Sequence, residues 1–324
     1  MDNKTLNFCQ VSLSRDIPII LQNYQSLKTF YKNIQINIIC PKSELNIFKK
    51  NLNFDEFYFF CEEDLISFGK FTNIFSQIPA KPFFKDEMKN RLQWYYQQVL
   101  KITFVINFIK NNNTTIIIWD ADTIITKKIN FLENKLSYKY GTLFEYHKKY
   151  FQTAESILGL LPRYYISSLI QFLCVTKKEC DFFLKILGIN NTKNNDIPKI
   201  LSNIILNNII KTHNVYSGSL FSEYELIGIS NLLNKNTKQQ AIFTLRSGLD
   251  GQLTKKQFFI AKLLNVYHVT YEHTHLNVNS KNMLARDQKW FNFLKILIKF
   301  YPRFLLKNII HNFKFFFDFS RWGR

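Results

Sequence analysis

The sequence predicts an α/β fold built around a parallel sheet, and three observations carry this prediction. Short apolar runs of strand length alternate with helical segments between residues 6 and 61. A later run, Ile116 to Ile118, is apolar without interruption, as in a central strand buried on both faces. With 46% apolar residues among 324, the chain can fill the core of one large domain or two small ones. We therefore expect a globular protein.

The first elements are predicted from this alternation and from the residues that stop each run. Ser14 to Asp16 offers a helix cap, Pro18 suits a first helical turn, and Pro41 ends the second strand. The order strand, helix, strand, helix, strand is typical of a parallel, nucleotide-binding sheet. The predicted strands are residues 6–13, 36–40 and 57–61, and the predicted helices run to about residue 31 and over 43–52.

The rest of the chain is less regular. Residues 64–85 contain Gly69, Pro79 and Pro82, which favours a long surface loop. A long helix is predicted over residues 86–110, where three asparagines end it. Further strands are predicted at residues 141–146, 169–175, 241–245 and 266–271, and further helices at 197–211 and 221–233.

Two aspartates, Asp120 and Asp122, follow the isoleucine run in the segment TIIIWDADT. Residues i and i+2 of an extended segment point to the same side, so both carboxylates can face one hard cation. Ligands of open α/β sheets gather at the carboxyl ends of the strands, where this pair is expected. Aspartate is also common wherever strands end, so the triplet alone arises often by chance. In this context we predict that the pair binds Mn²⁺ or Mg²⁺ on a diphosphate.

The helix before the aspartates carries a polar cluster. Lys101 falls one turn after Gln97 and Gln98, so amide and ammonium donors can point from one face toward a phosphate or a sugar. We predict that all three line the ligand pocket. The alternative is an ordinary solvated helix face.

The segment SLFSEYELIG begins another predicted helix. Ser222 and Glu225 fit the S-x-x-E capping box, which explains Glu225 by structure alone. Glu223 has no such explanation, although the helix dipole favours a carboxylate in the first turn. We take Glu223 as the candidate catalytic base.

Histidines 268, 273 and 275 cluster at the end of the last predicted strand. A neutral imidazole binds manganese-like ions readily, so one of them, His273 in our assignment, is a candidate third metal ligand. A chance cluster on a polar loop is the alternative.

Composition indicates where the chain works. The five cysteines form no C-x-x-C pair, which favours reduced thiols and a cytoplasmic setting over a disulfide framework or a zinc site. The first residues lack the charged and apolar regions of a signal peptide. No apolar run approaches the ~18 residues of a membrane-spanning helix.

The net charge of +19 favours an anionic partner, although part of this charge reflects a compositional bias toward Lys, Asn, Ile and Phe.

The basic excess is strongest at the C-terminal end, where residues 289–324 hold eight Lys or Arg against one acid. We therefore divide the chain into a domain at residues 1–286 and a basic amphipathic helical tail at 287–324. We expect the tail to attach the protein to an anionic membrane surface, on the inner face of the cell membrane, and no nucleic acid is expected as a partner. An ordinary helical subdomain with solvated lysines is the alternative. The basic ridge consists of Lys295, Lys299, Arg303, Lys307, His311 and Lys314.

Three motifs together resemble the DUF6492 family, a bacterial family to which glycosyltransferase activity is ascribed. They are the segment from Trp94 to Lys101, the D-x-D-T at Asp120 to Thr123, and the S-E-Y-E-L at Ser222 to Leu226, in matching order over roughly residues 5 to 275. Ile227 departs from the family's pattern, which has tyrosine there. The resemblance implies a GT-A (Rossmann-like) fold that binds a nucleotide-diphospho-sugar through a metal on the D-x-D motif. Ser12 and Arg15, near the end of the first predicted strand, are assigned to the same donor site.

The predicted function is a metal-dependent glycosyltransferase that moves a sugar to a saccharide or lipid-linked acceptor in cell-surface polysaccharide or lipopolysaccharide synthesis. The bound cation would stabilise the charge on the leaving diphosphate. Two alternatives remain. A haloacid-dehalogenase-like phosphatase would use Asp120 as its nucleophile, but it needs a later acidic pair that the sequence does not show. A non-catalytic basic protein that binds membrane or nucleic acid would explain the charge and leave the aspartates without a role.

Overall fold

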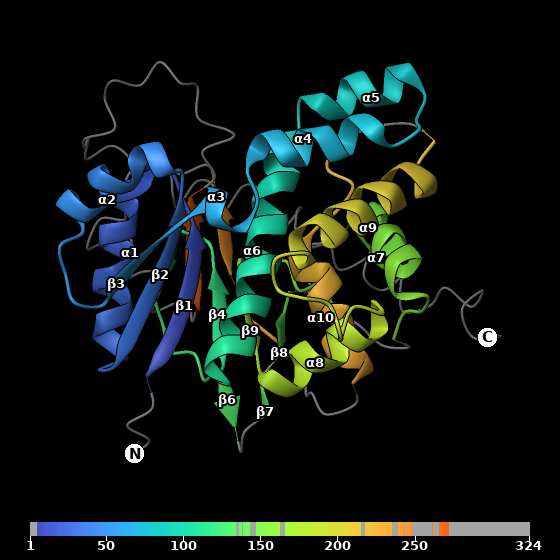
Figure 1. Ribbon diagram of the computed structural model, residues 1–324. Helices are drawn as coiled ribbons and strands as arrows, with labels where there is room; N and C mark the ends of the chain where they lie inside the picture. The colour runs from blue at the N-terminus through green and yellow to red at the C-terminus, as the bar shows by residue number, and fades with distance from the viewer. Residues whose placement is uncertain are drawn as a thin grey trace.

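The computed structural model describes 5–133, 136–137, 139–142, 147–162, 166–214, 218–234, 239–242, 244–247, 261 and 266–271 of the chain (Figure 1). Several expectations therefore concern residues outside the described part. These are most of the strand at 141–146, the histidines at 273 and 275, and the basic tail at 287–324. The predicted division into 1–286 and 287–324 stays a prediction.

A five-stranded sheet forms the centre of the molecule, in the order β3-β2-β1-β4-β9. Four strands run parallel, and the edge strand β9 runs antiparallel to β4. The prediction of an α/β fold with a parallel-rich sheet is confirmed. The strands are β1 (Leu6–Val11), β2 (Ile34–Cys40), β3 (Phe57–Cys61), β4 (Ile116–Trp119) and β9 (Phe172–Val175).

Helices cover both faces of this sheet, so most residues of its central strands are buried (Figure 1). Side chains alternate along β1: Phe8 packs in the core beneath α1 and α2, whereas Cys9 packs in the core beneath α6. The same alternation separates Ile117 from Ile118 on β4. The helices are α1 (Ile17–Phe30) and α2 (Leu45–Asn51) on one face and α6 (Leu92–Asn112) on the other, with short 3-10 turns at Ser14–Asp16 and Lys42–Glu44.

A second group of helices lies beside α6, where α8, α9 and α10 contact α6, and α7 contacts α9 and α10 (Figure 1). Two of them, α7 and α8, were not predicted. Helix α8 begins with a complete capping box between Thr176 and Glu179, a signal that was present in the sequence. The group consists of α7 (Lys148–Leu158), α8 (Lys177–Ile186), α9 (Ile197–Thr212) and α10 (Glu223–Leu233).

The predicted surface loop at residues 64–85 is wrong, because the structure is mainly helical there. Ser67 caps α4 by accepting a hydrogen bond from the Lys70 amide, and Phe71 and Phe75 on α4 are buried against the core. Pro82 occupies the first position of α5, where proline is tolerated. The single helix predicted at residues 86–110 is two helices in the structure. Its first residues belong to α5, and the rest belong to α6. The helices are α3 (Glu62–Leu65), α4 (Phe68–Gln77) and α5 (Pro82–Lys89).

Short strands beside the main sheet hold the segment that follows β4. Strand β12 runs antiparallel to β5 and parallel to β11, and Thr123 of β5 pairs with Thr270 of β12. The predicted strand at 241–245 is instead the end of β10 and the start of β11, in two different sheets. The strands are β5 (Thr123–Ile125), β6 (Leu132–Glu133), β7 (Leu136–Ser137), β8 (Lys139–Gly141), β10 (Gln239–Ala241), β11 (Leu245–Ser247) and β12 (His268–Tyr271).

All five cysteines are free thiols, and four of them are buried. Within the described ranges, none of the helices combines the length and the apolar character that crossing a bilayer requires.

Candidate active site

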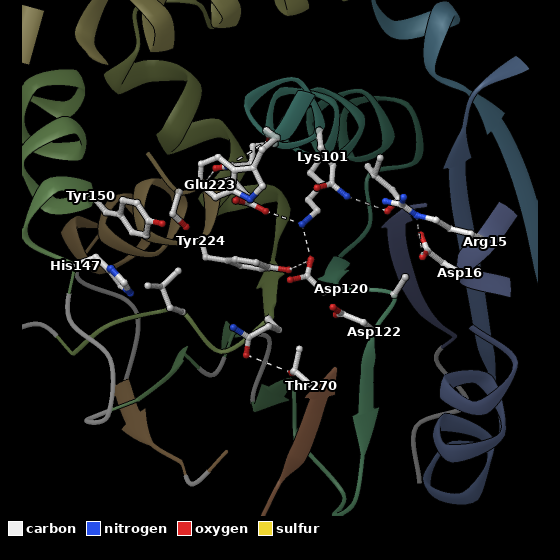
Figure 2. Close-up of a pocket in the computed structure, with 18 residues that line it drawn as sticks. Arg15, Asp16, Lys101, Asp120, Asp122, His147, Tyr150, Glu223, Tyr224 and Thr270 are labelled. Atoms are coloured by element: carbon white, nitrogen blue, oxygen red, sulfur yellow. Dashed lines mark hydrogen bonds and ion pairs between the residues drawn. The ribbon is translucent and has the colours of Figure 1, made fainter. Parts of the chain in front are cut away.

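A pocket of about 320 Å³ opens where β1 and β4 end, below the first half of α6 and the start of α10 (Figure 2). Its walls come from segments far apart in the sequence, including the loop after β1, the turn after β4, and strand β12. The carboxyl ends of parallel strands are where open α/β sheets bind their ligands. The pocket is therefore the natural candidate for the functional site.

Asp120 and Asp122 both line this pocket, but for a different reason from the predicted one. Strand β4 ends at Trp119, and the two aspartates belong to a tight turn rather than to an extended segment. The Thr123 amide donates to the Asp120 carbonyl at 3.0 Å and closes this turn. The turn, not strand alternation, brings the two carboxylates into one pocket.

Lys101 joins two parts of the site from the middle of α6. Its Nζ donates to Asp120 Oδ1 at 2.5 Å and to Glu223 Oε1 at 2.7 Å. The side chains of Lys101 and Glu223 are only 5% and 4% exposed, whereas that of Asp120 is 25% exposed. Because both carboxylate oxygens contact one nitrogen, Asp120 and Glu223 lie close together on the same side of the pocket.

Burial and charge act in opposite directions on this cluster. Burial alone would lower the pKa of Lys101, but Asp120 and Glu223 outweigh it and hold that pKa above its usual value, so the ammonium is charged. Burial also raises the pKa of Glu223, and Lys101 opposes this rise. One ammonium thus lies between the carboxyl groups of Asp120 and Glu223, and Asp122 lines the same pocket.

Tyr224 fixes the orientation of Asp120. Its phenol donates to Asp120 Oδ1 at 2.8 Å, and its ring lies 5.1 Å from Lys101 Nζ, within range of a cation–π interaction. Burial and the neighbouring Asp120 raise the pKa of Tyr224 well above its usual value, so the phenol keeps its proton. Both donors act on Oδ1, so Oδ2 of Asp120 accepts no hydrogen bond within the described part of the chain.

Gln97 and Gln98 line the pocket, and their side chains also hydrogen-bond to the backbone of neighbouring elements. Gln98 Oε1 accepts a hydrogen bond from the Glu223 amide at 3.0 Å, which satisfies one of the first amides of α10. Gln97 Nε2 donates to the carbonyl of Val11 at 3.3 Å, at the end of β1. The predicted polar face of α6 is therefore turned inward, not solvated.

The predicted capping box at α10 forms only partly as expected. Ser222 accepts a hydrogen bond from the Glu225 amide, as a capping serine should. The Glu225 carboxylate, however, accepts hydrogen bonds from the Ser167 hydroxyl and the Ser168 amide. Glu225 therefore anchors α10 to the segment before β9 and keeps Glu223 in place.

Gln171 lines the pocket in a strained conformation that the sequence did not indicate. Its φ of 57° lies in the left-handed region, which costs a residue with a side chain about 1–2 kcal/mol. Its carbonyl accepts a hydrogen bond from the Asp120 amide at 2.9 Å, and its side chain meets the Thr270 hydroxyl at 3.5 Å. Backbone strain of this kind often marks functional sites. Here the strained residue holds the aspartate turn through the hydrogen bond between its carbonyl and the Asp120 amide.

Of the two residues assigned to the donor after β1, the structure places one in the pocket. Arg15 lines it, and its side chain is 75% exposed, so the guanidinium can reach a ligand. Ser12 is buried and is not among the lining residues. Its hydroxyl has no hydrogen-bond partner within the described part of the chain. Asp16, which also lines the pocket, accepts a hydrogen bond from the Leu13 amide and shapes the loop.

The other end of the pocket is aromatic, which sequence reasoning missed except for the inclusion of Trp94 in a motif. Trp94 of α6, His147 and Tyr150 at the start of α7 all line it. Tyr150 and His147 stack with ring centroids 4.9 Å apart. Nothing in the local sequence signals that these residues meet the aspartates, because α7 was itself not predicted.

The histidine expected at the metal lies outside the described residues. His268, its neighbour in the cluster, is fully buried between Trp119 and Phe172 and does not line the pocket. Within the described ranges, no three His, Cys, Asp or Glu side chains converge as a metal site.

The residues present nevertheless fit a divalent cation bound together with a diphosphate. Mg²⁺ is commonly held by one or two carboxylates while substrate phosphates and waters complete its shell. Asp120 and Asp122 supply hard oxygen ligands of this type, and Oδ2 of Asp120 is not occupied by Lys101 or Tyr224.

Comparison with known proteins finds no matching family model and no matching curated protein. Among solved structures, the chain is similar to a galactosyltransferase, LgtC, in complex with donor and acceptor sugar analogs (TM-score 0.46, 11% identity, covering 90% of this chain and 95% of that one). An active-site mutant of LgtC gives a TM-score of 0.43 at 8% identity, covering 89% and 95%. Mouse xyloside xylosyltransferase 1 gives 0.42 at 9% identity, covering 85% and 100%.

Proposed function

We propose that this protein is a metal-dependent glycosyltransferase of the GT-A type that uses a nucleotide-diphospho-sugar as donor. The observation that carries the proposal is the meeting of Asp120, Asp122 and Glu223 in one pocket at the carboxyl end of the sheet. Two carboxylates suit a cation on the diphosphate, and a third, Glu223, is held beside them by Lys101. The sequence resemblance to the DUF6492 family supports the same activity, and membership of that family stays a prediction.

In this proposal, Asp120 and Asp122 hold a Mn²⁺ or Mg²⁺ ion, which when bound stabilises the negative charge on the leaving nucleoside diphosphate. Arg15 adds a second positive group within reach of the phosphates. Glu223 accepts the proton of an acceptor hydroxyl. The hydroxyl oxygen then bonds to the anomeric carbon while the bond from that carbon to the diphosphate oxygen breaks. Lys101 keeps the Glu223 carboxylate oriented during this step.

A release assay across nucleotide-activated sugars tests the proposal. UDP-, GDP- and CMP-linked sugars are incubated with the protein and Mn²⁺, and free nucleotide is measured. Manganese-dependent release from a diphospho-sugar supports a glycosyltransferase. Inorganic phosphate released from a phosphomonoester, with no nucleotide release, would support the alternative phosphatase that uses Asp120 as nucleophile. Failure of both reactions would leave the non-catalytic alternative.

Glu223→Gln is expected to slow sugar transfer by about 10²–10⁴-fold, the usual contribution of a positioned base. Because glutamine keeps the shape of the side chain and still accepts a hydrogen bond from Lys101, nucleotide affinity should stay near the native value. The measurement is kcat for transfer beside nucleotide affinity from calorimetry. The control is Glu155→Gln, which changes an exposed carboxylate on α7. Native transfer by Glu223→Gln would assign this residue a structural role only.

We also propose that the acceptor is a saccharide or lipid-linked saccharide of cell-surface polysaccharide synthesis. Attachment to the inner face of the membrane through residues 287–324 stays a prediction from the sequence, supported by the basic ridge of that segment. Sedimentation with anionic liposomes measures it, and recovery equal to that of a chain ending at residue 286 would contradict it.

A further inference from the structure

We propose that Trp94, His147 and Tyr150 form an acceptor subsite that binds the ring of a saccharide. This inference rests on the proposed function and extends it, because it assigns a chemical class of acceptor to one end of the pocket. The three residues come from α6 and from the start of α7, and all three line the pocket.

The three rings form one continuous stack. Tyr150 lies in the middle, with its centroid 4.9 Å from that of His147 and 6.4 Å from that of Trp94, and each pair of planes is inclined by 27°. Tyr150 is buried, whereas His147 is exposed and Trp94 is half-buried. The two outer rings, His147 and Trp94, can therefore contact a ligand. The central ring, Tyr150, packs against both of them and supports their positions.

His147 and Tyr150 of the stack lie on the opposite side of Glu223 and Tyr224 from Arg15 and Asp16 (Figure 2). The proposed diphosphate position, at Asp122 and Arg15, is thus separated from the aromatic end by the candidate base Glu223. A ligand resting on the aromatic stack presents its rim to Glu223. An acceptor hydroxyl needs this position in order to lose its proton to Glu223 and attack a sugar held on the other side.

The geometry leaves no slot for a flat ring between Trp94 and Tyr150. A third ring inserted between Trp94 and Tyr150 needs roughly 7–8 Å between them, since carbon atoms pack best at about 3.5–4.0 Å. The centroids are 6.4 Å apart, so the stack is a closed wall and not a slot. A ligand therefore rests on the wall with one face only. A pyranose suits this arrangement, because one face presents C–H groups while its hydroxyl rim reaches the polar groups of the pocket.

The test is saturation-transfer NMR of the full chain with the methyl glycosides of glucose, galactose and mannose as probes. Sorbitol, an acyclic polyol with similar hydroxyl groups, is the comparison ligand. At least one glycoside should receive saturation at the protons of one ring face, and sorbitol should not. His147→Ala and Trp94→Ala should weaken glycoside binding at least about fivefold, the scale expected of one aromatic contact. Trp94→Phe should retain most of the binding.

Phe83→Ala is the matched control, because it removes an aromatic ring that is 69% exposed on α5 and does not line the pocket. Each variant is checked for an unchanged melting temperature, and nucleoside diphosphate affinity with Mn²⁺ should stay within about twofold of native. Native glycoside binding by both His147→Ala and Trp94→Ala would overturn the inference, as would no glycoside binding by the native chain. Loss of nucleotide affinity instead would identify the wall as a base-binding site and also overturn it.

These outcomes are separate from the failure of the proposed function. Glycoside binding that depends on Trp94 and His147, with no nucleotide release from any donor, would keep the saccharide subsite and remove the transferase. Nucleotide release from a donor, with no effect of the two aromatic substitutions on glycoside binding, would keep the transferase and remove the saccharide subsite.

Discussion

Asp122→Asn is expected to abolish metal-dependent nucleotide binding while the fold stays intact. The substitution keeps the size of the side chain and removes one of two carboxylates that line the pocket at the end of the sheet. Loss of groups that merely support a metal ligand costs about 10–100-fold in affinity, so loss of a ligand should cost at least as much. The measurement is calorimetry with UDP and GDP, each with and without Mn²⁺.

Asp120 is not the residue changed in this test, because it accepts hydrogen bonds from Lys101 and Tyr224. A change at Asp120 would disturb the buried cluster as well as the cation. The control is Asp181→Asn, an exposed carboxylate paired with Lys177 on α8, which should bind nucleotide as the native protein does. If Asp122→Asn kept native affinity in the presence of Mn²⁺, the cation site would have to lie elsewhere.

The sequence predicted the central sheet well, because its signals are local. The apolar run at Ile116–Ile118 and the prolines at positions 18 and 41 mark strand and helix boundaries without reference to the rest of the chain. The same local signals fail between residues 64 and 85. There, Gly69, Pro79 and Pro82 were taken as loop residues, although a capping serine and buried phenylalanines form helices around them.

The candidate site was predicted in composition but not in arrangement. The aspartates, the α6 cluster and Glu223 each follow from a short motif, and all of them line one pocket. What the motifs could not give is the contact between Lys101 and Glu223, which are 122 positions apart in the chain. The aromatic end was missed for the same reason, since Tyr150 meets Trp94 only after α7 packs near α6.

Lys101→Met is expected to cost about 3–5 kcal/mol of unfolding free energy, the scale for removing one partner from a buried ion pair. Methionine fills a similar volume but leaves Glu223 buried, with Asp120 close by and no ammonium between the two carboxylates. The measurement is chemical denaturation at neutral pH, and nucleotide release should be lost at the same time.

Two further variants separate this charge effect from a packing defect. Lys28→Met removes the cation of an ion pair with Glu56 that is 2.6 Å long but partly exposed, and it should cost below about 1 kcal/mol. The double variant Lys101→Met with Glu223→Gln should recover much of the lost stability, because it no longer buries an unpaired carboxylate. Its transferase activity should stay lost, since the proposed base is absent. If the double variant were as unstable as Lys101→Met alone, the loss would come from packing around the α6 side chain, and the buried charge cluster would not be what makes Lys101 essential to the fold.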